Sequence, residues 1–478
     1  MTMKSILRSA PTDWARVAAL TFSPIAAIGV GIIALLGFAA SAACIELPFP
    51  SEKLTLKRAI ELTLKNHPKA MQSRAESDAA RERVGEARSA LLPQLYGAAE
   101  YLGATDNPIG NTTYLNTGII PRITGTLHGG SQNAVQDFSP GNNFLTGVGV
   151  DQYLYDFGRV RGRIEQSRFE ANAASDQSRT TDLQLIFIAS QRYFALLAAE
   201  QKVKVYQKAI LQRTEQLHEA DVKAAASLVS QIDVLTAQAQ LSRAKLDLVQ
   251  AENLRDVAKI ALDDAMSIGP NPPAYELTDV MNYQTVAGDP ESYFSDAKRR
   301  RPDLKAIELM AQSMGAQIQE VRSDYFPTFH AVAGYESMGT GLPAANNYHA
   351  GLLVTWPIFN GFLTDYQLSE MRAHRKAILY AIDDLTQHIW LEVNSAYVDL
   401  KTSIERIHQA EKTLAASSGQ LELAEKRYTA GLGNIIELTD AERLFVQDDA
   451  AYVDALYSYS VARAELDRAT AASLPYGP

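Results

Sequence analysis

The 478-residue sequence has a single cysteine, Cys44, so it forms no intrachain disulfide. Its net charge of -10 argues against nucleic acid as a partner, because phosphate binding requires a basic surface. Common enzyme motifs are also missing, since there is no Walker loop, no Gly-x-Ser-x-Gly, no His-Glu-x-x-His and no cysteine pair for a metal. These absences predict a protein that is not an enzyme and that needs no cofactor.

Beyond the N-terminal segment, the sequence has no apolar run of about 18 residues, the length that a membrane helix requires. The N-terminal segment itself has the layout of an export signal, with Lys4, Arg8 and Arg16 before an uncharged stretch that ends in small residues at Ala43. We therefore predict a signal peptide over residues 1–43. The stretch is also long enough to span a bilayer, so an uncleaved anchor is the alternative.

Cys44 directly follows the small residues at the end of this segment, which is where lipid is attached to bacterial lipoproteins. Lipoprotein signals usually carry leucine three residues before the cysteine, and this sequence has Ser41 there. Lipidation of Cys44 and ordinary cleavage beside a chance cysteine are both open interpretations.

Proline and glycine are nearly missing from two long stretches. Neither occurs between Arg163 and Ile268, and between Phe362 and Leu474 there are only three glycines. Because these residues end or weaken helices, we predict very long helices over about 159–268 and 362–472. A helix from Arg159 to Ala225 alone would be about 100 Å long.

Each long stretch has one break near its middle, at residues 225–230 and 429–434, which predicts the tips of two helical hairpins. Ser230 and Asn434 are the expected N-caps of the returning helices. Apolar residues recur at spacings of three and four, which is typical of seams buried against a neighbouring helix. The two predicted seams comprise Leu183, Ile186, Phe187, Tyr193, Phe194 and Leu197, and then Leu246, Val249, Val257 and Ile260.

The order of motifs is repeated along the chain. Pro68 and Pro93 recur as Pro302 and Pro327. The motif Tyr153-Leu-Tyr-Asp-Phe-Gly158 corresponds to Trp356-Pro-Ile-Phe-Asn-Gly361 in the second half of the chain. Such duplication predicts two similar structural units. We divide the chain into a signal at 1–43, a first repeat at 44–270, a link at 271–295 and a second repeat at 296–478.

Strands are expected only in front of the long helices, at about 93–103, 144–157, 327–337 and 349–359. In the last strand Ala350, Leu352 and Val354 alternate with Gly351 and Leu353. Each strand has about ten residues, which is the length of a tilted membrane strand, although a soluble layer packed on the helices is the alternative. Aromatic residues near the strand ends fit an interfacial girdle: Tyr153, Tyr155, Phe157, Trp356 and Phe359.

Four strands cannot close a membrane barrel by themselves, because known barrels begin at about eight strands and an open edge is excluded from lipid. If these strands enter a membrane, several copies of the chain must contribute to one barrel. The strand count therefore predicts oligomerisation.

This combination resembles the TolC family of outer-membrane efflux ducts. The likeness rests on the doubled proline spacing, the doubled strand-ending motifs and the tip sequence from Arg427 to Ala441, and it runs from about Leu54 to Ala472. The resemblance implies a homotrimer in which each chain adds four strands to a 12-stranded barrel in outer-membrane lipid. Long helices would form a periplasmic tube, and shorter helices near 271–320 and at the chain ends would form a belt around it. With Cys44 lipidated, the chain would fall in the lipoprotein subgroup.

The resemblance also implies partners and a gate. An inner-membrane pump supplies energy, and a periplasmic adaptor joins the pump to the helical tips. Carboxylates on the inner helices ring the closed end of the tube, and the matching positions here are Glu437 and Asp440. They are three residues apart and therefore share one helix face. A ring of carboxylates attracts cations, although acids in the first turns of a helix also simply suit its dipole.

In the family, a tyrosine near the second tip meets an aspartate near the first tip and holds the hairpins together. Tyr428 and Asp233 occupy those positions, whereas a basic link residue of the family is replaced by Gly433. We expect adaptor docking at the tips, which comprise Ser227, Leu228, Gly431, Leu432 and Gly433. Ser227 stands where the first tip usually has glycine, so docking is expected to differ in detail.

Two functions account for these features. One is an outer-membrane duct of a tripartite efflux or type I secretion system, and the other is a non-conducting trimeric coiled-coil scaffold or adhesin of the envelope. Only the duct explains strands of membrane length at the same place in each repeat. The sequence does not identify the exported substrate.

Overall fold

The computed structural model describes residues 53–105, 140–227, 229–269, 274–285, 288–339 and 345–472. The predicted signal peptide, Cys44 and Leu228 lie outside this part. The helices are α1 (Leu56–Asn66), α2 (Pro68–Ser89), α3 (Arg159–Ala225), α4 (Gln231–Met266), α5 (Pro290–Arg300), α6 (Pro302–Arg322), α7 (Leu363–Thr429) and α8 (Ile435–Ala469), with a 3-10 turn η1 (Ser323–Tyr325) after α6. The strands are β1 (Gln94–Thr105), β2 (Pro140–Tyr155), β3 (Thr328–Gly339) and β4 (Ala345–Thr355). This confirms a mostly helical chain with one small sheet.

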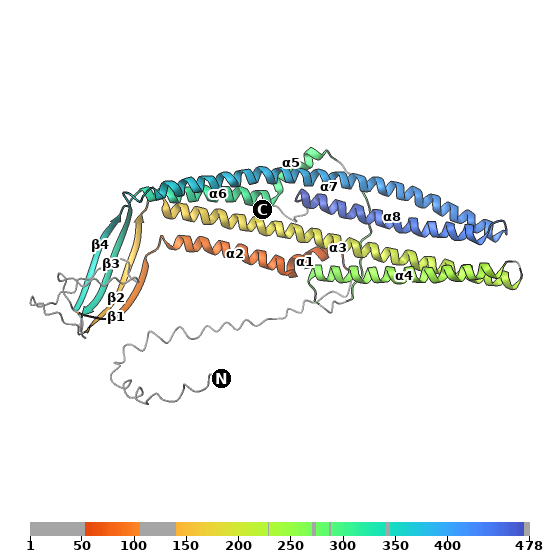
Figure 1. The fold of residues 1–478 in the computed structure, drawn as a ribbon, viewed down its shortest axis with the longest axis horizontal. Helices are drawn as coiled ribbons and strands as arrows, with labels where there is room; N and C mark the ends of the chain where they lie inside the picture. The colour runs from red at the N-terminus through yellow and green to blue at the C-terminus, as the bar shows by residue number, and fades with distance from the viewer. Residues whose placement is uncertain are drawn as a thin grey trace, which may run out of the picture. The chain divides into compact units, whose positions relative to one another are not determined.

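The four strands form an antiparallel sheet in the order β1-β2-β3-β4 (Figure 1). The registers pair Leu95 with Val150 between the first two strands and Tyr335 with Tyr348 between the last two. One face of the sheet is apolar and exposed, and it includes Leu95, Tyr101, Val148, Tyr335, Tyr348, Leu352 and Val354. The other face carries the polar side chains, which is the alternation of a membrane barrel strand.

The repeated motifs have a structural reason. Pro68 and Pro302 stand at the first positions of α2 and α6, where a helix needs no backbone donor. Pro93 and Pro327 directly precede β1 and β3. Each proline pair therefore marks one helix and the strand that follows it. The helix α6 packs lengthwise on α3 and α7, so the expectation that residues up to about 320 form a belt is wrong for this segment.

The strand-ending motifs start the long helices. The Asp156 carboxylate accepts hydrogen bonds from the backbone N–H groups of Gly158 and Val160, at 3.1 Å and 2.8 Å. In the second half, the Asn360 side chain donates to the hydroxyl of Thr364 at 2.7 Å. Asp156 thus satisfies two backbone donors that would otherwise be left open at the start of α3, whereas Asn360 binds only a side chain of α7.

The helices lie side by side in one layer. Towards the sheet their order is α2, α3, α6 and α7, and towards the tips it is α4, α3, α8 and α7 (Figure 1). The hairpins α3–α4 and α7–α8 therefore meet along the contact between α3 and α8. The helices α3 and α7 have 67 residues each. These hairpins confirm the prediction from the missing prolines and glycines.

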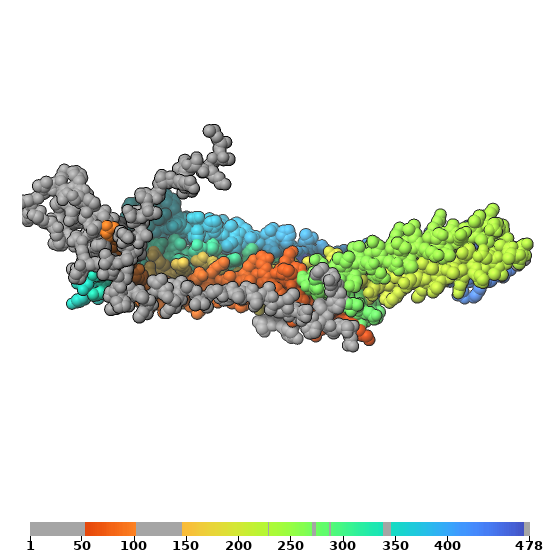
Figure 2. Space-filling model, turned by 90° about the horizontal axis from the view of Figure 1, so that it is seen from below, coloured from red at the N-terminus to blue at the C-terminus, as the bar shows by residue number. Residues whose placement is uncertain are grey.

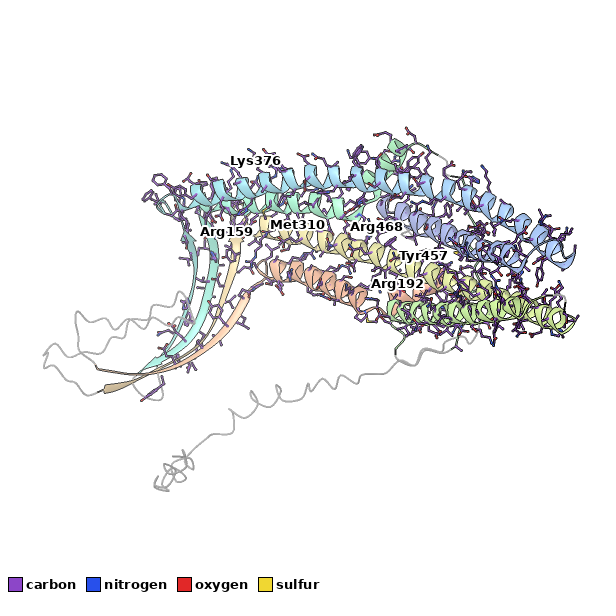
Figure 3. All side chains as sticks on the ribbon, turned by 45° about the vertical axis from the view of Figure 1, so that its right-hand side comes forward. Arg159, Arg192, Met310, Lys376, Tyr457 and Arg468 are labelled. Carbon is purple, nitrogen blue, oxygen red and sulfur yellow. The ribbon has the colours of Figure 1, made fainter. Side chains whose placement is uncertain are left out.

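The core follows the inner sides of this layer. Ile389, Val393, Leu400 and Ile407 of α7 pack with Leu466 of α8. Beyond them, Arg301 and Arg468 both bind the carboxylate of Glu392 and so fasten the end of α8 to α7, where Figure 3 labels Arg468. The predicted seam on α3 is buried at Leu183, Ile186, Tyr193 and Leu197.

The second predicted seam has a different environment. Leu246, Val249, Val257 and Ile260 are between 55% and 67% exposed. They lie on α4, which is at the edge of the helical layer and forms part of the visible surface of the tip half in Figure 2. Their helical spacing is confirmed, but among the described residues no neighbour covers them, so the structure does not show the buried seam predicted here.

The aromatic residues at the strand ends divide between two environments. Tyr155, Phe157, Trp356 and Phe359 are more than 40% exposed, as an interfacial girdle requires. Tyr153 instead packs against His330 on the polar face, with ring centroids 4.0 Å apart and the ring planes tilted by 48°.

Candidate functional site at the helical tips

The second hairpin turns within five residues. The backbone N–H groups of Leu432 and Gly433 both donate to the Arg427 carbonyl, at 2.9 Å and 3.0 Å. Gly431 has a φ of +73°, a conformation that favours glycine. A Cβ on Gly433 would lie 3.2 Å from the Cβ of Arg427, so a larger residue here would require small shifts of its neighbours. The tight turn leaves Leu432 74% exposed at the tip.

The first hairpin turns without glycine. Ser227 adopts a φ of +59°, which costs a non-glycine residue some backbone strain. The returning helix α4 begins with a capping box, in which the Ser230 backbone N–H donates to Asp233 Oδ2 at 3.1 Å. At the second tip, the Asn434 side chain accepts from the Glu437 N–H at 2.8 Å. Both expected N-caps are confirmed.

Glu437 and Asp440 lie in the first two turns of α8, and their side chains are 44% and 62% exposed. Each carboxylate has an arginine beside it. Arg427 Nε is 3.1 Å from Glu437, and Arg443 Nε is 3.8 Å from Asp440. Neither arginine was predicted to pair with these carboxylates, although the i,i+3 spacing of Asp440 and Arg443 is visible in the sequence. The acidic character of the tip is therefore lower than the two carboxylates alone imply.

Tyr428 is 5% exposed, and its hydroxyl finds no hydrogen-bond partner within the described residues. Lys223 of α3 lies over its ring, 4.2 Å from the centroid, and reaches its carbonyl oxygen at 3.4 Å. Burial, helped by the charges of Glu219 and Asp233, raises the pKa of Tyr428. Since Asp233 is engaged in its capping box, no hydrogen bond joins it to Tyr428 within the chain, and their link stays a prediction.

A buried ion pair joins the two hairpins a few turns above the tip. Arg213 of α3 binds Glu442 of α8, and their side chains are 8% and 2% exposed. Arg213 also reaches the carbonyl oxygen of Thr439 at 3.4 Å, whereas Glu442 Oε1 has no partner among the described residues. Burial raises the pKa of Glu442 to about 7, against the opposing charge of Arg213.

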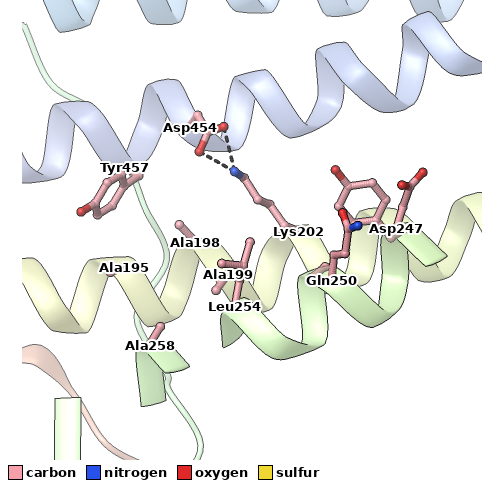
Figure 4. A pocket seen from close by; sticks show the side chains of 12 residues that line it. Ala195, Ala198, Ala199, Lys202, Asp247, Gln250, Leu254, Ala258, Asp454 and Tyr457 are labelled. Atoms are coloured by element: carbon pink, nitrogen blue, oxygen red, sulfur yellow. Dashed lines mark hydrogen bonds and ion pairs between the residues drawn. The ribbon is translucent and has the colours of Figure 1, made fainter. Parts of the chain in front are cut away.

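Further from the tip, Lys202 of α3 binds Asp454 of α8 at 2.7 Å (Figure 4). Beside them is a cavity of about 290 Å³ between α3, α4 and α8. Lys202, Arg213 and Lys223 are ten or eleven residues apart, about three helical turns, and so share one face of α3. We call them the α3 cation row. Each member binds a group of the second hairpin, which sequence reasoning missed because the partners are more than 200 residues away.

The described residues contain no cluster of side chains that would hold a metal ion. Among the helices that the structure describes, none is sufficiently long and apolar to cross a bilayer. The described residues therefore provide ion pairs and a cation–ring contact that join the two hairpins near the tips, and a sheet with one apolar face.

Helical hairpins of this length, joined to a sheet with one lipid-compatible face, define the class of envelope-spanning channel subunits. A family model described as outer membrane efflux protein matches residues 111–267 and 293–472. The chain belongs to this family, and it is an efflux channel protein of the outer membrane.

The chain is similar to outer membrane protein OprJ of Pseudomonas aeruginosa, with 24% identity over 87% of this chain and 83% of that protein. It is also similar to outer membrane protein TolC of Escherichia coli, with 23% identity over 83% and 78% of the two chains. Its fold matches the CmeC outer membrane channel of Campylobacter jejuni, with a TM-score of 0.70 and 18% identity over 87% of this chain and 85% of that chain.

Proposed function

We propose that three copies of this chain close one 12-stranded barrel and form the outer-membrane duct of a tripartite efflux or type I secretion system. The single observation that carries the proposal is the sheet, which has a lipid-compatible face but ends at β1 and β4. An unpaired strand edge in hydrocarbon leaves backbone groups unsatisfied. Sister copies satisfy both edges when β4 of one copy pairs with β1 of the next.

The helical layer supports the same assembly. Its edge helices, α4 and α7, both carry exposed apolar residues. On α4 these include Leu246 and Val257, and on α7 they include Trp390, Leu391 and Val398. Joining the α7 edge of one copy to the α4 edge of the next closes the layer into a tube. The equal lengths of α3 and α7 also support an internal twofold repeat.

The duct conducts passively and has no catalytic step. Cargo enters from an inner-membrane pump through a periplasmic adaptor that docks on the tips, where Ser227, Leu228 and residues Gly431–Gly433 are the proposed contacts. Glu437 and Asp440 line the periplasmic gate. The names of several relatives support efflux as the role, among them the toluene efflux pump outer membrane protein TtgC of Pseudomonas putida.

Reconstitution in planar bilayers tests the duct. We expect ion conductance from a species with the mass of three chains, measured by light scattering in mild detergent. A trimer without conductance would instead identify a scaffold or adhesin. A chain that stays monomeric in mild detergent would refute the shared barrel.

A further inference from the structure

Four residues lie in one row across the polar face of the sheet. The strand registers align Tyr96 of β1 with Gly149 of β2, Gly149 with Gly334 of β3, and Gly334 with His349 of β4. The outer strands thus carry rings, and the two central strands carry glycines.

The rings lie over the glycines. A Cβ on Gly149 would be 2.6 Å from the Tyr96 ring, and a Cβ on Gly334 would be 2.6 Å from the His349 ring. Either distance is too short for any side chain larger than glycine to fit without displacing the ring. The rings and the glycine backbones together form a continuous surface, which we call the ring platform. His349 is exposed and Tyr96 is partly exposed, so a planar molecule can reach the platform.

The same face is acidic. The four strands contain no lysine or arginine, and their three carboxylates are Glu100, Asp151 and Glu336. The registers place all three on the face of the ring platform, because Asp151 pairs with Gln94 and Gly147 pairs with both Ala98 and Glu336. Asp151 and Glu336 flank the platform, each two residues along a strand from one of its glycines, which is about 7 Å.

These carboxylates differ in what they bind. Asp151 Oδ1 is 2.8 Å from Nδ1 of His330, which itself is 2% exposed. Glu336 is 9% exposed, and its Oε2 is buried without a hydrogen-bond partner in the part of the chain that the structure describes. A buried carboxylate oxygen that lacks a partner has capacity for a further donor or cation.

We propose that the ring platform is a binding site for planar aromatic cations on the inner wall of the barrel, one site for each chain. The inference rests on the proposed function, because the polar face becomes the lumen only when sister copies close the barrel. Stacking on Tyr96 and His349 favours a flat aromatic molecule, and the π-face of tyrosine attracts positive charge. Glu336 and the other lumenal carboxylates supply the counter-charge.

Ethidium, a planar aromatic cation, is a suitable probe, and Mg²⁺ is a cation without rings that keeps its shell of water. We expect ethidium to block the current of the reconstituted protein. The double variant Tyr96→Leu with His349→Leu should raise its half-blocking concentration about fivefold or more. Block by Mg²⁺ should show little change, because the hydrated ion is attracted by the carboxylates and does not stack on the rings.

Tyr335→Leu with Tyr348→Leu is the matched control. These rings form a cross-strand pair on the same two strands as half of the platform, but they lie on the apolar face. Equal ethidium block in the platform variant and the wild type would overturn the proposal, and so would an equal loss in the control variant.

Ethidium binding in detergent, measured by its fluorescence, tests the binding site separately from the duct. Platform-dependent binding by a trimer without current would refute the duct but support the site. A conducting trimer with platform-independent binding would refute the site alone. Gly334→Ala gives an independent check, since its Cβ displaces the His349 ring and should weaken ethidium block while Gly351→Ala, with open space around its Cβ, should not.

Discussion

The buried pair between Arg213 and Glu442 makes a quantitative prediction about how firmly the two hairpins are joined. Glu442 has a pKa of about 7 in the folded chain against an ordinary value of 4.5, because burial outweighs the attraction of Arg213. One pKa unit is worth about 1.4 kcal/mol, so the shift corresponds to roughly 3 kcal/mol as an upper bound.

The sign follows from proton linkage. The folded chain holds the proton of Glu442 more tightly than the unfolded chain does. The stabilisation is therefore fully present below pH 4.5 and is lost as the pH rises through about 7. We expect the contact between α3 and α8 to open more easily at pH 8 than at pH 5.5, by about 1–3 kcal/mol.

Hydrogen exchange of the α8 backbone amides around Glu442 measures this opening free energy at both pH values, after correction for intrinsic exchange rates. Glu442→Gln should abolish the difference between the two pH values. Asp440→Asn, an exposed carboxylate two residues away, is the control and should leave it intact. An unchanged pH dependence in Glu442→Gln, or an opposite sign in the wild type, would refute the reasoning.

Four further outcomes are expected. Glu437→Ala with Asp440→Ala should weaken cation selectivity in planar bilayers, and unchanged reversal potentials would exclude the gate role. Lys223→Met should loosen the tips by about 0.5–2 kcal/mol and raise single-channel conductance, because it removes the cation over the Tyr428 ring; the same conductance as wild type would count against the α3 cation row. Leu246→Asp should reduce the trimer fraction in light scattering, since it places a charge on the exposed edge of α4. If Cys44 is lipidated, the wild type should incorporate labelled fatty acid and Cys44→Ser should not, and a wild type without label would exclude lipidation.

Local signals predicted the elements of this fold well. The scarcity of proline and glycine located both hairpins, because these residues weaken or end helices. Ser230 and Asn434 identified the starts of the returning helices, since capping depends on a few adjacent residues. The proline pairs were recognised as a repeat, although only the structure shows that each pair marks a helix followed by a strand.

The long-range contacts near the tips could not be predicted from the sequence. Arg213 and Glu442 are ordinary charged residues in their own helices, and only the packing of α3 on α8 turns them into a buried pair. Asp233 forms a capping box with Ser230, a local contact that was not predicted, and its link to Tyr428 stays a prediction. The ring platform was equally hidden, because it depends on the register of four strands from opposite halves of the chain.

The matched spans of α3 and α7 restrict how a protein of this shape can evolve. Removing one residue from either helix shortens it by about 1.5 Å and rotates everything beyond by about 100°. Such a change would move the tip of one hairpin along the axis relative to the tip of the other. It would also turn the lysine and arginine side chains of α3 away from their partners. We therefore expect insertions and deletions among homologues to come in compensated sets, with gains or losses of about whole heptads shared by both outgoing helices and by the helices that run back along them.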